Sequence, residues 1–111
     1  MSCHAAEKWK SLIGLGFRAG KVITGTEAVW SVLKKKRAYL VVVAEDASVR
    51  TKAEFLRACE EIGIPCIVLS KKEVLASCTG QSPRAVLAIT DQQMARAVLR
   101  VVRPEFSSAN G

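Results

Sequence analysis

The sequence predicts an α/β domain in which short strands alternate with helices. Two continuous β-prone runs, residues 39–44 and 66–69, have the apolar composition of strands that are covered on both faces. Stretches with apolar residues at helical spacing precede and follow these runs, and capping signals stand where the helices begin. This alternation predicts a largely parallel or mixed sheet between layers of helices.

The first segment combines helical spacing with a run of glycines. Residues 5–17 carry apolar side chains at helical spacing, and the basic turn 18–21 leads to a short strand at 22–23. The run 14–20 is similar to a dinucleotide-binding fingerprint, which works when it follows a strand and opens a helix. Here the run ends a helical pattern, so its glycines are expected to allow close packing and the turn, and no cofactor is expected.

A second helix is expected to begin at a capping box. The Thr24 hydroxyl would accept a hydrogen bond from an otherwise unpaired backbone amide of the first turn. The side chain of Glu27, three residues later, would accept one from the Thr24 amide. Its inward face would be formed by Ala28, Val29, Val32 and Leu33. The helix ends in the basic run 34–37, whose cations suit the negative end of a helix.

The strand at 39–44 is followed by a polar loop and a third helix. A second capping box at 51–54 is expected to start this helix, and Gly63 to end it, with Pro65 just beyond. The buried stripe of the helix would be formed by Phe55, Ala58, Cys59 and Ile62.

The remaining elements repeat the alternation. After the strand at 66–69, the capping pattern 70–73 predicts a short helix to about residue 77. The loop 78–84 then leads to a strand at 85–89, and Asp91 is expected to cap a last helix. The inward face of that helix would carry Met94, Val98, Val101 and Val102, with Arg96, Arg100 and Arg103 on the opposite side.

The composition describes one small basic protein. The chain has 111 residues and a net charge of +7, from 17 Lys+Arg against 10 Asp+Glu. This length predicts one domain over residues 1–103 and a frayed tail, 104–111. The charge favours an anionic partner, above all nucleic acid. No stretch reaches the roughly 20 apolar residues of a membrane span and no signal core is visible, so a cytoplasmic protein with no membrane partner is expected.

Side chains suited to catalysis or metal binding are scarce. His4 is the only histidine, so the common Cys–His and Ser–His–Asp arrangements lack their base. The cysteines do not have the spacing of a zinc knuckle or redox motif, and neither a metal nor a disulfide is expected. They are Cys3, Cys59, Cys66 and Cys78.

A phosphate-accepting, receiver-like domain is one alternative. Glu45 and Asp46 follow one buried strand, and Ser70 and Lys71 follow the next, which is where α/β proteins place ligand sites. Such a site needs several carboxylates around a divalent cation, and only two are clustered here. Helix caps and a solvated loop explain these residues better.

Several motifs occur in one order and spacing over nearly the whole chain. They are FRAGK at 17–21, Gly25 opening a helix, AYLVVVAED at 38–46, the pairs 59–60 and 64–65, and Gly80 before the last strand. The sequence thereby resembles the ribosomal-protein family that binds kink-turn RNA, the L-seven-Ae / L-thirty-e superfamily. Within that family, the segments DAS at 46–48 and TDQ at 90–92 are most similar to the bacterial YlxQ-like branch. The resemblance implies a three-layer αβα sandwich around a mixed sheet of about four strands, without catalytic activity.

The resemblance also implies an RNA-binding site. Family members bind RNA that is sharply bent beside tandem sheared G·A pairs, and the start of their second helix reads guanine edges in the widened groove. The matching positions are Gly25, Thr26, Glu27, Ala28 and Ser31, with Lys21, Lys34 and Lys35 as phosphate contacts. The loop that would contact the flipped-out bulge nucleotides contains Gln81, Ser82, Pro83 and Arg84. The implied partner is kink-turn or ribosomal RNA, bound by a monomer in association with the ribosome.

Departures from the family pattern keep a second hypothesis open. Many kink-turn binders have Asn–Glu after the glycine and small residue, and a lysine three residues later, where this chain has Glu27, Ala28 and Ser31. Glu27 can accept hydrogen bonds from guanine or complete the capping box. Pro83 and Arg84 likewise replace aliphatic residues. The alternative is a protein-interaction or ligand-sensing α/β domain with weakened or lost kink-turn binding.

Overall fold

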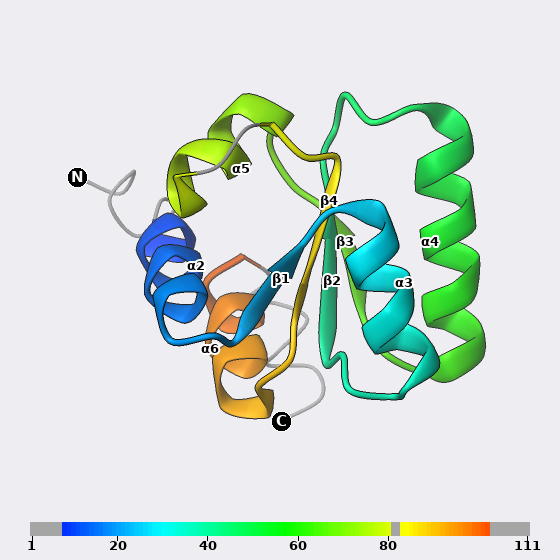
Figure 1. Cartoon of the computed structure of the whole chain (residues 1–111), viewed down its shortest axis with the longest axis horizontal. Helices are drawn as coiled ribbons and strands as arrows, with labels where there is room; N and C mark the ends of the chain where they lie inside the picture. Colours follow the sequence, from blue (N-terminus) through cyan, green and yellow to red (C-terminus); the bar gives the residue numbers. More distant parts are fainter. Residues whose placement is uncertain (1–7, 81–82, 103–111) are drawn as a thin grey trace.

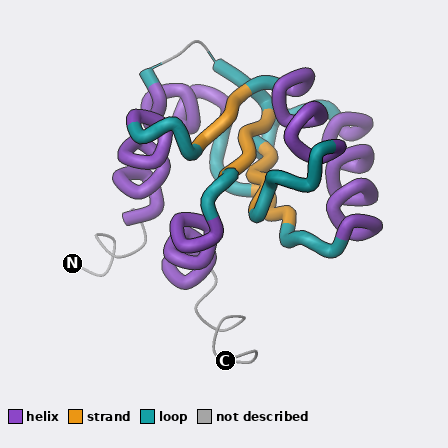
Figure 2. Tube along the Cα trace, turned by 60° about the horizontal axis from the view of Figure 1, so that its bottom comes forward, coloured by secondary structure: helices purple, strands orange, loops and turns teal. Residues whose placement is uncertain are grey.

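Helices cover both faces of a central sheet in the computed structural model, which describes residues 8–80 and 83–102 (Figure 1). One side carries α2 (Lys8–Arg18), α5 (Lys72–Thr79) and α6 (Gln92–Val102). The other side carries α3 (Thr26–Lys34) and α4 (Val49–Ile62). Figure 2 shows the strands, in orange, between these two groups of helices. The predicted three-layer αβα architecture is therefore confirmed.

The sheet is mixed. Its four described strands are β1 (Val22–Thr24), β2 (Leu40–Val43), β3 (Cys66–Val68) and β4 (Val86–Ile89), in the order β1-β4-β2-β3. Strand β4 runs antiparallel to both β1 and β2, whereas β2 and β3 are parallel. The register pairs Val43 with Val86 and Leu40 with Ile89, so β4 begins where β2 ends.

The core follows from this strand order. Every residue of β2 and β4, the two central strands, is buried. The prediction that 66–69 is covered on both faces is wrong at Val68, which is 43 % exposed. The reason is that β3 lies at an edge of the sheet, and an edge position depends on the order of strands that are distant in the sequence.

The glycines of α2 serve helix packing, as the sequence predicts. A Cβ atom at Gly14 would lie 2.9 Å from the backbone oxygen of Cys78 in α5, and one at Gly16 would lie 2.9 Å from Cγ2 of Val22. These contacts bring α2 against α5 and β1. Trp9 and Ile13 of the same helix are buried, while residues 5–7 of the predicted helix lie outside the described part.

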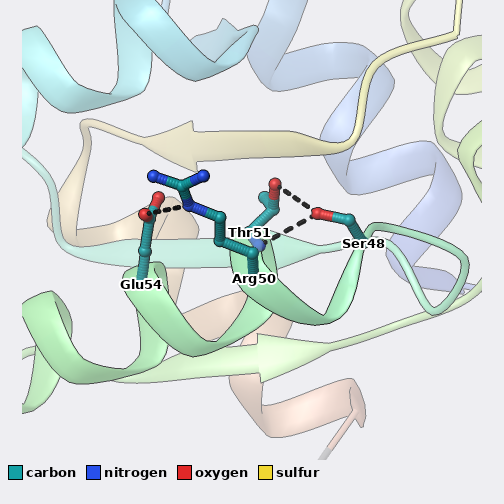
Figure 3. Close-up of polar contacts among 4 residues, drawn as sticks. All are labelled: Ser48, Arg50, Thr51 and Glu54. Carbon is teal, nitrogen blue, oxygen red and sulfur yellow. Dashed lines mark hydrogen bonds and ion pairs between the residues drawn. The ribbon is translucent and has the colours of Figure 1, made fainter.

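Helix α4 begins earlier than its predicted capping box. Its N-cap is Ser48, whose Oγ accepts a hydrogen bond from the Thr51 amide at 3.0 Å (Figure 3). Glu54 does not complete a box, because it accepts from Nε of Arg50 at 3.1 Å. The helix ends at Gly63, which adopts φ 92° as a left-handed C-cap. Ile62 is 40 % exposed, which corrects its predicted place in the buried stripe.

The caps of the last two helices differ from each other. Asp91 caps α6 as predicted, since its Oδ2 accepts from the Met94 amide at 2.8 Å. The capping pattern predicted at 70–73 is wrong: the N-cap of α5 is Lys71, with no side-chain cap bond of its own. Arg96 and Arg100 are exposed on α6, and Arg103 lies outside the described residues.

Candidate nucleic-acid interface

Four chain segments meet at one end of the sheet, where β1, β2 and β3 end and β4 begins, at the top of Figure 1. Backbone hydrogen bonds join them in sequence: Gly25 N to Val86 O at 3.0 Å, Ala44 N to Ala85 O at 2.8 Å, and Glu45 N to Ser70 O at 2.7 Å. We call this surface the loop edge, and it contains residues 25–28, 45–46, 70–71 and 83–84. The bonds place the start of α3 beside the segment that leads into β4.

The N-terminus of α3 has free backbone donors. Its N-cap is Gly25, with φ 97° and ψ 146°, and no side chain forms a cap hydrogen bond there. The first intrahelical bond runs from the Val29 amide to Gly25 O at 2.9 Å. The three amides between these residues therefore have no acceptor within the helix, and the helix dipole adds positive potential to them.

The capping box predicted at 24–27 is wrong, and the correction matters for the site. Thr24 is the last residue of β1, where it pairs with Leu87, so it does not occupy the N-cap position. Glycine occupies that position because the backbone has a positive φ that other residues rarely adopt. The amides that a capping side chain would have satisfied are left for another acceptor.

Arg84 stands beside this helix start. Its Nη1 atom lies 3.7 Å from the position that a Cβ atom on Gly25 would occupy. The two residues are distant in the sequence, yet the fold puts an exposed guanidinium next to the uncapped amides. Both kinds of group are donors that suit phosphate oxygens and base acceptors. Pro83 is also exposed, whereas Gln81 and Ser82 lie outside the described residues.

The outer face of α3 continues the site along the helix. Thr26, Glu27, Ala28 and Ser31 are exposed. For Ala28 this corrects the predicted inward face, which consists of the buried Val29 and Leu33 with Val32 partly buried. Lys34 lies at the far end of α3, about 12 Å from Thr26 at the usual rise of about 1.5 Å per residue. Lys35 is the C-cap of the helix.

Lys21 lies apart from the other implied phosphate contacts. It precedes β1, whose first residue pairs with Ile89 at the end of β4, so it is at the opposite end of the sheet from the loop edge. Its Nζ is 3.8 Å from Oδ1 of Asp91, and its backbone oxygen accepts from Thr90. The structure thus gathers the α3 N-terminus with Arg84 and separates Lys21 from them.

Two further cations lie in the loop edge or directly against it. Lys71 is the exposed N-cap of α5, directly after the edge contact made by Ser70. The Nζ of Lys52, in the first turns of α4, donates to Glu45 O at 3.0 Å. The sequence motifs do not indicate either lysine as an RNA contact. Their sequence positions, after the carboxyl ends of the parallel strands β2 and β3, are the feature that could indicate a binding role.

Asp46 has a structural role that argues against the receiver-like alternative. Its Oδ1 accepts from the Lys72 amide at 3.0 Å, so the carboxylate caps α5 across the loop edge. Within residues 8–80 and 83–102, no three His, Cys, Asp or Glu side chains gather as a metal site requires. Asp46 is thus explained by helix capping.

The described cysteines lie in α4, β3 and α5 and form no disulfide with one another. Cys59 is buried, as predicted, and its side chain forms a hydrogen bond with Cys66 that lowers the pKa of Cys59 against the opposing effect of burial. Burial raises the pKa of Cys78. Cys3 and His4 lie outside the described part of the chain.

The described helices are short or amphipathic. None of those in residues 8–80 and 83–102 is both long and apolar enough to cross a bilayer.

Known proteins with similar sequences fall into two named groups. The chain is 35 % identical over 75 residues to the RNA-binding protein YlxQ of Enterococcus faecium, covering 68 % of this chain and 73 % of the relative. It is 33 % identical over 74 residues to the protein of that name from Bacillus subtilis, covering 67 % and 74 % of the two chains. It is 32 % identical over 76 residues to the large ribosomal subunit protein eL8 of Thermoplasma volcanium, covering 68 % and 63 %.

Solved structures share the fold. A protein of unknown function from Bacillus halodurans superposes with a TM-score of 0.83 at 30 % identity, covering 86 % of this chain and 96 % of that one. A 15.5 kD RNA-binding protein of Giardia lamblia superposes with a TM-score of 0.77 at 21 % identity, covering 96 % and 89 %. The sequence family described as Ribosomal protein L7Ae/L30e/S12e/Gadd45 matches residues 7–99, and the chain belongs to that family.

Proposed function

We propose that this chain is a non-enzymatic RNA-binding protein that recognises kink-turn-like structured RNA through the loop edge. The observation that carries the proposal is the uncapped start of α3 at Gly25, with the Arg84 guanidinium beside it. Relatives named RNA-binding proteins and a ribosomal subunit protein support this reading over the protein-interaction or ligand-sensing alternative. The protein would act as a monomer in the cytoplasm, in association with ribosomes.

The interface fits a distorted RNA groove better than a regular duplex. A-form RNA has a deep, narrow major groove that side chains cannot read, so base edges become accessible where the backbone bends or bases are unpaired. The α3 N-terminus presents backbone donors, and the exposed Glu27 presents acceptors suited to guanine N1–H and N2–H₂ groups. One helix end therefore offers both kinds of partner to base edges exposed in a bent groove.

Arg84 compensates for the family side chains that are missing on α3. Ala28 and Ser31 cannot make the contacts of a glutamate and a lysine, but the guanidinium adjoining Gly25 supplies charge and paired donors from the neighbouring segment. Lys71 would extend this positive edge. Lys34 and Lys35 would contact phosphates where the RNA runs along α3.

Binding to a kink-turn and to a straight duplex of equal length tests the proposal. Electrophoretic mobility shift at two salt concentrations should show tighter binding to the kink-turn at both, because the bent groove alone presents base edges to α3. Equal weak binding to both RNAs would contradict kink-turn recognition. The absence of binding to either RNA would contradict the RNA-binding function itself.

Replacing Lys34 and Lys35 with alanine should reduce the salt dependence of binding to the kink-turn RNA. Each lost phosphate contact is expected to lower the slope of log K against log[salt] by about one unit. The matched control replaces Arg96 and Arg100, which are exposed on α6 at the other side of the sheet, and should leave the slope nearly unchanged. If the slope of the Lys34/Lys35 variant equals that of the original protein, these lysines form only a solvated helix end.

A further inference from the structure

Trp30 joins two hollows on the outer surface of α3. One hollow, of about 570 Å³, lies between α3 and α4. It is lined by Trp30 of α3 and by positively and negatively charged side chains that alternate along α4. The other, of about 600 Å³, is lined by Trp30 together with Glu27, Ser31 and Lys34. The second hollow therefore includes three residues of the proposed RNA-binding face. Trp30 is the point at which that face continues into the groove between the helices.

The indole of Trp30 packs against the core on one side. It stacks on the ring of Phe55 with centroids 4.4 Å apart and an angle of 23° between the rings. Phe55 is 1 % exposed, whereas Trp30 is only partly buried. A rigid, partly exposed aromatic ring of this kind is a stacking platform, and stacking on aromatic rings is how proteins bind unpaired bases.

The rim of the groove favours a base over a phosphate backbone. Along α4 the rim residues alternate in charge and are Arg50, Glu54, Arg57 and Glu61. Such a rim is neutral overall, so it has no net attraction for a run of phosphates. It does offer guanidinium donors and carboxylate acceptors side by side, and the edges of nucleobases carry both acceptors and donors.

Arg50, near the start of α4, has hydrogen-bond donors that its contact with Glu54 does not use. Arg50 uses Nε for its contact with Glu54, and its two terminal nitrogens make no contact among the residues drawn in Figure 3. Its side chain is 88 % exposed. This guanidinium is therefore positioned to donate to a ligand that enters the groove over Trp30.

We infer that the groove between α3 and α4 binds an unpaired RNA nucleotide, whose base stacks on Trp30 and meets the charged rim of α4 at its edge. The inference rests on the proposed function, because the nucleotide would belong to a strand that leaves the RNA bound at the loop edge. Its ligand is a single-stranded extension of that RNA, which runs along the exposed face of α3 past Ser31 to Trp30.

The fluorescence of Trp30 reports directly whether an RNA base stacks on its indole. Trp9 is 6 % exposed on α2, and replacing it with phenylalanine leaves Trp30 as the only tryptophan in the chain. Kink-turn RNA with a short single-stranded extension, placed in turn on each strand end, should quench the emission of this variant on binding. The same RNA without an extension should bind and quench the emission clearly less, because it places no unpaired base on the indole.

Affinity measurements on Trp30 variants test the same point independently. One of the extensions should tighten binding to the original protein about tenfold, which lies within the usual gain from stacking one base. Trp30→Ala should lose this gain, whereas its affinity for the RNA without an extension should change much less, and Trp30→Phe should retain most of the gain. Because Trp30 also packs on Phe55, the melting temperature of each variant is measured to exclude unfolding.

The outcomes separate this inference from the proposed function. If the kink-turn binds but no extension quenches Trp30 or tightens binding, the groove does not take an RNA base and the inference is wrong. If neither RNA binds, the proposed function fails together with the inference.

Discussion

Charge reversal at Arg84 is expected to lower the affinity for kink-turn RNA by about tenfold to a hundredfold. The side chain is exposed, so Arg84→Glu should leave the fold intact. Its Nη1 lies beside Gly25 at the uncapped start of α3, and a carboxylate there would repel the phosphates and lose the donors to base edges. A contact of this kind contributes roughly 1–3 kcal/mol. Fluorescence anisotropy with labelled RNA measures the change.

The matched control is Arg96→Glu. It changes the net charge by the same amount, but Arg96 is exposed on α6, across the sheet from α3. A general loss of positive charge should weaken binding by at most about threefold. Equal losses in the two variants would show that Arg84 acts only through the overall charge and makes no specific contact.

Truncation of Phe55 to alanine is expected to lower the free energy of unfolding by about 3–5 kcal/mol. The phenyl ring is 1 % exposed in the core beneath α4 and supports Trp30 at a centroid distance of 4.4 Å. Its removal leaves a cavity that the surrounding side chains fill only in part. Because small domains are stabilised by about 5–15 kcal/mol in total, the change should be evident in urea unfolding followed by circular dichroism.

The neighbouring residue provides the comparison for Phe55. Leu56 follows it on the same helix and is 42 % exposed, so Leu56→Ala should cost less than about 1 kcal/mol. Similar losses for the two variants would mean that the ring of Phe55 is not packed in the core as described.

The sequence predicts most of the fold because its strongest signals are local. The run 39–44 contains the central strand β2, and Asp91 and Gly63 mark helix ends through their own backbone and side-chain chemistry. Capping boxes are weaker signals, since a Ser or Thr near a helix start has several possible roles. Ser48 precedes Thr51 by three residues and takes the N-cap position that the sequence pattern assigns to Thr51.

The features that the sequence does not predict depend on contacts between distant segments. Val68 is exposed because β3 lies at the edge of the sheet, and strand order is not a local property. The stacking of Trp30 on Phe55 joins two helices, α3 and α4. The approach of Arg84 to Gly25 likewise joins segments that are distant in the sequence and are linked by the hydrogen bond between Gly25 and Val86. The family resemblance names candidate residues for the site, and the fold decides which of them lie together.

The most direct test of the RNA-binding surface is a map of backbone amide chemical shifts, recorded by NMR with and without kink-turn RNA. The largest changes are expected at the free amides of Thr26, Glu27 and Ala28, with further changes at Arg84, because the proposed interface brings these donors against the RNA at the loop edge. Amides around Arg96 and Arg100 on α6 should shift little. Changes concentrated on α6, with the start of α3 unaffected, would contradict the proposed interface.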